Sequence, residues 1–129
     1  MDAQGTFEIQ MTAEPPYSEE DGVSIGRVAF TKQFTGDFVG ESKVDFIGAR
    51  TPVPTSAGYV AIERLVGTLA GKRGSFVVQH TGVMTQGTQS LTITVVPDSG
   101  TGELVGLRGE MTIEKVEKAH HWRLRYDLA

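Results

Sequence analysis

The sequence predicts an all-β protein, an eight-stranded antiparallel up-and-down barrel. Gly accounts for 16 of the 129 residues, well above the usual share, so tight turns are frequent. Apolar and polar residues alternate with a period of two in several segments, as in strands that turn one face toward a core. Eight such runs lie between turn signals, and eight strands suffice to close a small barrel. No segment carries a sustained helical repeat.

The alternation is clearest at the two ends of the chain. Phe7, Ile9 and Met11 alternate with polar residues near the start, and residues 120–128 alternate apolar or aromatic with charged side chains. The eight expected strands lie near residues 5–13, 23–35, 38–48, 58–68, 73–85, 88–97, 105–116 and 119–128.

Most of the expected connections are short enough for hairpins. Gly36-Asp37, residues 69–72, Gln86-Gly87 and residues 116–118 each join two neighbouring runs. Two- to four-residue turns of this kind pair consecutive strands antiparallel.

Three longer breaks are typical of loops. Residues 14–22, 50–57 and 97–104 contain the prolines of the chain, which cannot lie inside a paired strand. None is long enough to link two domains, so we expect one domain over residues 1–129. A two-sheet sandwich is the alternative architecture.

A short pattern, Gly-x-Phe/Leu-x-Gly, occurs three times, beginning at Gly36, Gly67 and Gly102. Two glycines around one apolar residue suit a tight corner where the apolar side chain plugs the barrel end. We favour this structural role over ligand binding.

Composition excludes several classes of function. The net charge is -4 and the pI is about 5.3, without the basic surface that a nucleic-acid partner requires. No cysteine is present, and His80, His120 and His121 are too few and poorly spaced for a metal site. No phosphate-binding loop is present, so we expect no cofactor. No signal peptide or membrane span is evident, so we expect a cytoplasmic protein without a membrane partner.

The most informative region is the hairpin of residues 59–84, where ionisable groups interrupt two apolar strands. If the turn is residues 69–72, Gly67 pairs with Gly74, and Glu63 and His80 become diagonal neighbours on one face. A shift of one residue would separate them. The sequence therefore predicts a carboxylate–imidazole dyad that depends on this register.

Such a dyad suggests acid–base chemistry. Burial would raise the pKa of Glu63 toward neutrality, where it acts well as a general acid or base. The alternative is structural: Glu63 pairs with Arg64, Arg73 or a loop amide, and His80 is a satisfied interior histidine.

The other face of the same hairpin is also apolar, so something should cover it. A second subunit would do so, which predicts a homo-oligomer, with a dimer favoured. The loop of residues 50–57 folded over it is the alternative. The apolar residues of this face are Val60, Ile62, Val66, Val77 and Val83.

Two segments carry a family resemblance. Residues 63–82, which contain Glu63-Arg64-Leu65-Val66-Gly67-Thr68 and Val77-Val78-Gln79-His80-Thr81-Gly82, resemble a signature of a bacterial family of small uncharacterised proteins with an allene-oxide-cyclase-like barrel. Residues 96–109, with Pro97-Asp98-Ser99-Gly100-Thr101-Gly102, resemble its second signature. The resemblance covers nearly the whole chain and implies a closed or nearly closed antiparallel barrel of eight strands.

The resemblance implies little about activity, since fold is not function. Plant allene oxide cyclases, the distant relatives, close a fatty-acid epoxide into a ring inside an apolar barrel. No motif of theirs matches this chain, so Glu63 and His80 rest on the hairpin argument alone.

The leading hypothesis is therefore a barrel whose lumen binds a small apolar molecule and promotes a cyclisation or isomerisation. Glu63 or His80 would move the proton, and the pocket would hold a flexible substrate near its reactive shape. A non-catalytic carrier or sensor is one alternative, and an oligomeric interaction module with a side-chain-filled barrel is the other. The expected ligand-binding residues are Tyr59, Phe76, Val78, Met84, Trp122 and Tyr126.

Overall fold

The computed structural model describes residues 1–128, and strands account for most of them. One short 3-10 helix, η1 (Gly102–Leu104), precedes the last two strands. The strands are β1 (Asp2–Ala13), β2 (Ser18–Glu20), β3 (Val23–Gly36), β4 (Phe38–Arg50), β5 (Ala57–Leu69), β6 (Lys72–Thr85), β7 (Thr88–Val95), β8 (Arg108–Val116) and β9 (Ala119–Asp127).

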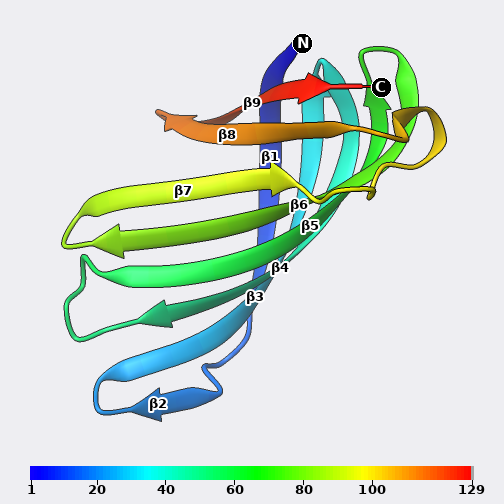
Figure 1. Cartoon of the computed structure of the whole chain (residues 1–129). Helices are drawn as coiled ribbons and strands as arrows, with labels where there is room; N and C mark the ends of the chain where they lie inside the picture. Colours follow the sequence, from blue (N-terminus) through cyan, green and yellow to red (C-terminus); the bar gives the residue numbers. More distant parts are fainter. Residues whose placement is uncertain (129) are drawn as a thin grey trace.

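The strands form a closed antiparallel barrel of eight, as the sequence predicts (Figure 1). Neighbours follow the chain from β3 to β9, β9 pairs with β1, and β1 pairs with β3 to close the sheet. This closure rules out the two-sheet sandwich. The short strand β2 was not predicted, and it pairs with the start of β3, before the part of β3 that pairs with β1.

The register of the β5–β6 hairpin is the one the sequence predicts. Gly67 pairs with Gly74, Glu63 with Val78 and Ala61 with His80. The turn is tight because Ala70 and Gly71 both have positive φ, at 48° and 84°.

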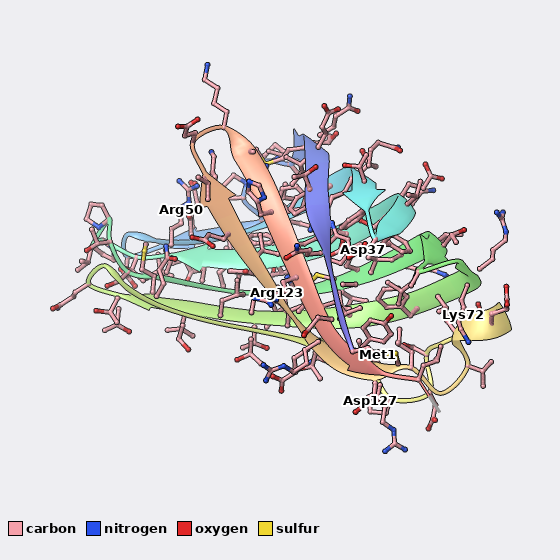
Figure 2. The ribbon with its side chains drawn as sticks, turned by 90° about the horizontal axis from the view of Figure 1, so that it is seen from above. Met1, Asp37, Arg50, Lys72, Arg123 and Asp127 are labelled. Carbon is pink, nitrogen blue, oxygen red and sulfur yellow. The ribbon has the colours of Figure 1, made fainter. Side chains whose placement is uncertain are left out.

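One end of the barrel is filled by side chains. Four phenylalanines and Trp122 pack against one another there, with ring centroids 5.3–6.1 Å apart. The middle residues of the three glycine patterns, Phe38, Leu69 and Leu104, are buried in the same cluster, which confirms their role as plugs. In Figure 2, Met1, Lys72 and Asp127 lie toward this end and Arg50 toward the opposite one.

The segment between β7 and β8 differs from the prediction. The expected strand 105–116 begins only at Arg108, because residues 96–101 run along the edge of β6 beyond the end of β7 and hydrogen-bond its backbone. Thr101 hydrogen-bonds Ser75, and Ser99 hydrogen-bonds the backbone of Val77. This segment therefore supplies Leu104 and Leu107 to the closed end and half-buries Val77.

The opposite end is open, and the barrel's shortest strand pairing is the one between β7 and β8. Two residue pairs join these strands, Ile93 with Met111 and Thr94 with Glu110. Beyond them the two strands diverge toward the open end (Figure 1).

Much of the apolar outer face of β5 and β6 stays exposed. Val60, Ile62, Val66 and Val83 are 46–53% exposed. Residues 50–57 do not cover them; this loop contacts the β6–β7 turn through Ser56 and Thr55 instead. The covering loop is therefore the wrong alternative, while the homodimer stays a prediction. Within the described residues, no helix is long and apolar enough to cross a membrane.

Candidate ligand-binding site

A buried polar cluster lies on the inner wall of the barrel where the packed end meets the open end. Glu63 is 0% exposed, and three side chains surround its carboxylate. Lys32 Nζ lies 3.1 Å and His80 Nε2 2.8 Å from Oε1, while Ser42 Oγ donates to Oε2 at 2.6 Å. The predicted Glu63–His80 pair thus exists, and it belongs to a larger network.

The register of the sheet brings these residues together. Lys32 pairs directly with Ser42 across β3 and β4, and Glu63 and His80 are diagonal neighbours across β5 and β6. All four side chains point inward, because each occupies an inward position in its strand's two-residue alternation.

The cluster holds Glu63 ionised. Burial is the largest single influence and raises its pKa, but the hydrogen bond from His80, the charge of Lys32 and the hydrogen bond from Ser42 together lower the pKa below its ordinary value. The expectation of a raised pKa is therefore wrong in direction. Three donors around one carboxylate outweigh its desolvation.

This ionised carboxylate also fixes how His80 is oriented. A carboxylate only accepts hydrogen bonds, so His80 must donate through Nε2–H. In a neutral imidazole the lone pair then lies on Nδ1. Among the described residues, no side chain or backbone group pairs with Nδ1.

An apolar pocket of about 200 Å³ lies directly above the cluster. Its polar lining consists of Lys32, His80 and His120, and the fully buried Glu63 does not reach it. Lys32 Nζ also lies 4.5 Å from the centre of the Phe7 ring, which stacks against His120 at 5.0 Å. The apolar wall consists of Phe7, Ile9, Phe30, Val44, Phe46, Tyr59, Ala61, Leu91 and Ile113.

Comparison with known protein families shows to which family the chain belongs. The model of a family described as "Protein of unknown function (DUF3224)" matches residues 3–126. The chain belongs to the DUF3224 family. A crystal structure of a DUF3224 protein of unknown function from Shewanella oneidensis MR-1 is 41% identical, with a TM-score of 0.94, and the match covers 100% of this chain and 98% of that one. No curated protein matches significantly.

Among the expected ligand-binding residues, Tyr59 lines the lumen pocket of this DUF3224 chain. Met84 lies nearer the rim, in a second hollow of about 270 Å³ that Tyr59 also lines. The other four are at most 7% exposed and pack into the closed end, away from the lumen pocket: Phe76, Val78, Trp122 and Tyr126.

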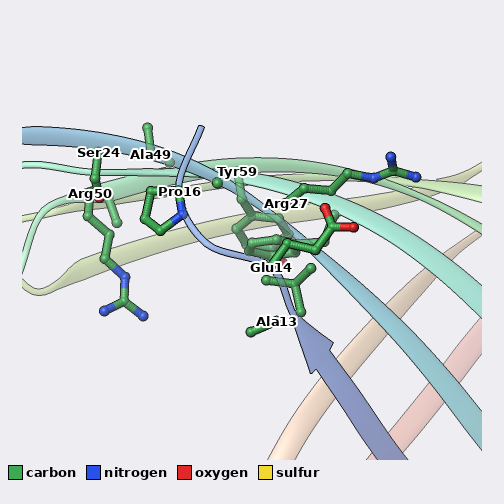
Figure 3. Close-up of a pocket in the computed structure, with 14 residues that line it drawn as sticks. Ala13, Glu14, Pro16, Ser24, Arg27, Ala49, Arg50 and Tyr59 are labelled. Carbon is green, nitrogen blue, oxygen red and sulfur yellow. The ribbon is translucent and has the colours of Figure 1, made fainter. Parts of the chain in front are cut away.

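Tyr59 and Phe46 separate the lumen pocket from the mouth. Their rings stack with centroids 4.5 Å apart, and the Tyr59 ring lies so close over Gly82 that a Cβ there would overlap it. Both rings also line a mouth cavity of about 400 Å³, where Pro16 faces Tyr59 and the Arg27 and Arg50 side chains point outward on opposite sides (Figure 3). A ligand entering from the mouth would pass this aromatic pair.

Lys32 and Ser42 were not predicted from the sequence, although both carry a signal. Lys32 falls between Phe30 and Phe34 in the inward register of its strand, and Ser42 falls between Gly40 and Val44. A lysine in an apolar register needs a buried counter-ion, and the register of β3 to β5 supplies Glu63.

Proposed function

We propose that this DUF3224 barrel binds a small, mostly apolar molecule in its lumen and promotes an isomerisation or cyclisation without a cofactor. One observation carries the proposal: Lys32 and His80, both bound to the buried carboxylate of Glu63, line an apolar pocket. An eight-stranded barrel has room for one such ligand. A few polar groups at the end of an apolar cavity are typical of small-molecule sites.

The size of the pocket limits the ligand. An apolar cavity of roughly 150 Å³ holds a benzene molecule, so about 200 Å³ suits a ligand of roughly ten non-hydrogen atoms. The aromatic wall favours a flat or ring-forming molecule. On sequence grounds we place the protein in the cytoplasm.

A non-catalytic carrier or sensor is the second candidate. The observation that favours it is the state of Glu63, which is ionised, held by three donors and shielded from the pocket. A carrier needs such a network only to orient a polar end of its ligand. An interaction module with a filled barrel accounts for the packed end but leaves the lumen pocket without a role.

Native mass spectrometry on protein purified from its own host tests ligand binding. We expect an adduct with the mass of a small apolar metabolite. Ala61→Met fills the pocket from β5 and should lose the adduct, whereas Ala29→Met, on the exposed outer face of β3, should keep it. Protein that stays free of adduct, even after incubation with an apolar ligand library, would refute both lumen functions.

A further inference from the structure

The lumen pocket presents an acceptor and a cation side by side. His80 donates through Nε2 to Glu63, so its Nδ1 lone pair is free for a ligand. Lys32 Nζ has one protein acceptor, Glu63, and two more N–H groups. Both residues line the pocket.

These two groups fit one kind of reaction centre. We propose that the site takes an apolar ketone or enone and moves a proton from the carbon next to its carbonyl group, with His80 as the base and Lys32 as the cation on the carbonyl oxygen. This inference rests on the proposed function, since it names the substrate class and the chemistry of the same pocket.

The step balances within the site. His80 Nδ1 takes the proton, the C–H electron pair becomes the carbon–carbon double bond of an enolate, and the carbonyl π electrons move to the oxygen. The Lys32 ammonium stabilises this oxyanion, as preorganised donors do where charge develops. The imidazolium then returns the proton to the same carbon or, where the substrate is a β,γ-unsaturated ketone, to the γ-carbon of the dienolate, which gives the conjugated isomer and restores His80.

Glu63 and Ser42 are positioning residues in this scheme. Glu63 fixes the imidazole in the tautomer with the lone pair on Nδ1 and stabilises the imidazolium that forms. Ser42 holds the second carboxylate oxygen at 2.6 Å. The burial of Glu63 keeps water from competing for these contacts.

A matched pair of probes separates binding from chemistry. Benzylacetone has an aromatic ring and a methyl ketone and fits the pocket in size; butylbenzene has the same apolar body without the carbonyl group. With the wild-type protein we expect benzylacetone to bind at least about tenfold more tightly than butylbenzene, because its oxygen meets the Lys32 ammonium. In deuterium oxide we also expect exchange of its hydrogens next to the carbonyl at least about a hundredfold faster than in buffer, as general-base catalysis provides.

The variants test the assigned roles. His80→Gln can still donate to Glu63 but has no base, so exchange should fall to the buffer rate while butylbenzene still binds. His121→Gln, on the exposed face of β9, should behave as wild type. A nitrogen-15 NMR spectrum of the wild-type protein checks the tautomer without mutation, and benzylacetone should shift the Nδ1 signal more than butylbenzene does.

Each outcome is decisive. Three results would overturn the inference and leave ligand binding standing. They are binding of benzylacetone without accelerated exchange, equal exchange rates for wild type and His80→Gln, and a proton on Nδ1 of the neutral imidazole. Failure of both probes to bind would overturn the inference and count against the proposed function. Fast exchange that depends on His80 would support both.

Discussion

Replacing Glu63 with Gln removes the charge from the centre of the buried network without changing its shape. The new amide can still accept a hydrogen bond from His80 and can donate one to Ser42. Lys32, which is 5% exposed, loses its counter-ion. The variant therefore tests how strongly the fold depends on one buried ion pair.

The expected loss is large for a chain of this size. Removing one partner of a buried ion pair destabilises a protein by about 3–5 kcal/mol, since the remaining charge is unpaired. Total stabilities are about 5–15 kcal/mol, so much of the fold's stability is at stake. For a domain of this length the loss corresponds to a fall in Tm of roughly 10–20 °C. The double variant Lys32→Met with Glu63→Gln removes both charges and should recover at least about 2 kcal/mol of this loss.

Urea unfolding followed by tryptophan fluorescence measures these differences, because Trp122 is buried in the closed end. Glu41→Gln is the control: Glu41 is exposed on the outer face of the neighbouring strand, and its change should stay within about 0.5 kcal/mol. A Glu63→Gln variant within about 1 kcal/mol of wild type, or a double variant no more stable than the single one, would refute the reasoning.

Three further predictions follow from the same structure. The folded-state pKa of Glu63 lies below its ordinary 4.5, so its ionised form stabilises the fold above about pH 4.5, and this stabilisation is lost as the pH falls through the folded-state pKa. Urea unfolding at decreasing pH should therefore show a smaller loss of stability for Glu63→Gln than for wild type. Ile62→Lys, in the middle of the exposed β5 face, should convert the predicted dimer to monomer in light scattering, and a wild-type monomer would refute the dimer. Leu104→Ala should cost about 2–5 kcal/mol in thermal unfolding, whereas Val105→Ala, at a 63% exposed position, should cost little.

The fold was predictable because two local features of the sequence, the period-two alternation and the short turns, indicate which residues face the core and which strands pair. The period-two alternation assigns residues to the core face, and short turns pair consecutive strands. The Ala70-Gly71 turn fixes the β5–β6 register, so the proximity of Glu63 and His80 could be worked out before the structure.

Two features escaped prediction because they depend on the assembled sheet and not on one hairpin. Lys32 reaches Glu63 across β4, two strands away, so their 3.1 Å contact depends on the combined register of three strands. The alternation also cannot tell which level of the barrel a residue occupies. Phe76 and Phe30 both point inward, but Phe76 fills the closed end and Phe30 lines the pocket.

The position of the polar network bears on its purpose. The aromatic cluster and the leucine plugs already supply a continuous core at the closed end, so the barrel does not need a buried ion pair to close. Apolar residues of similar volume at Lys32 and Glu63 would be at least as stabilising. A network that gains little over apolar packing at the same positions, while Lys32 and His80 line the apolar pocket, supports the proposed ligand-binding role of this site.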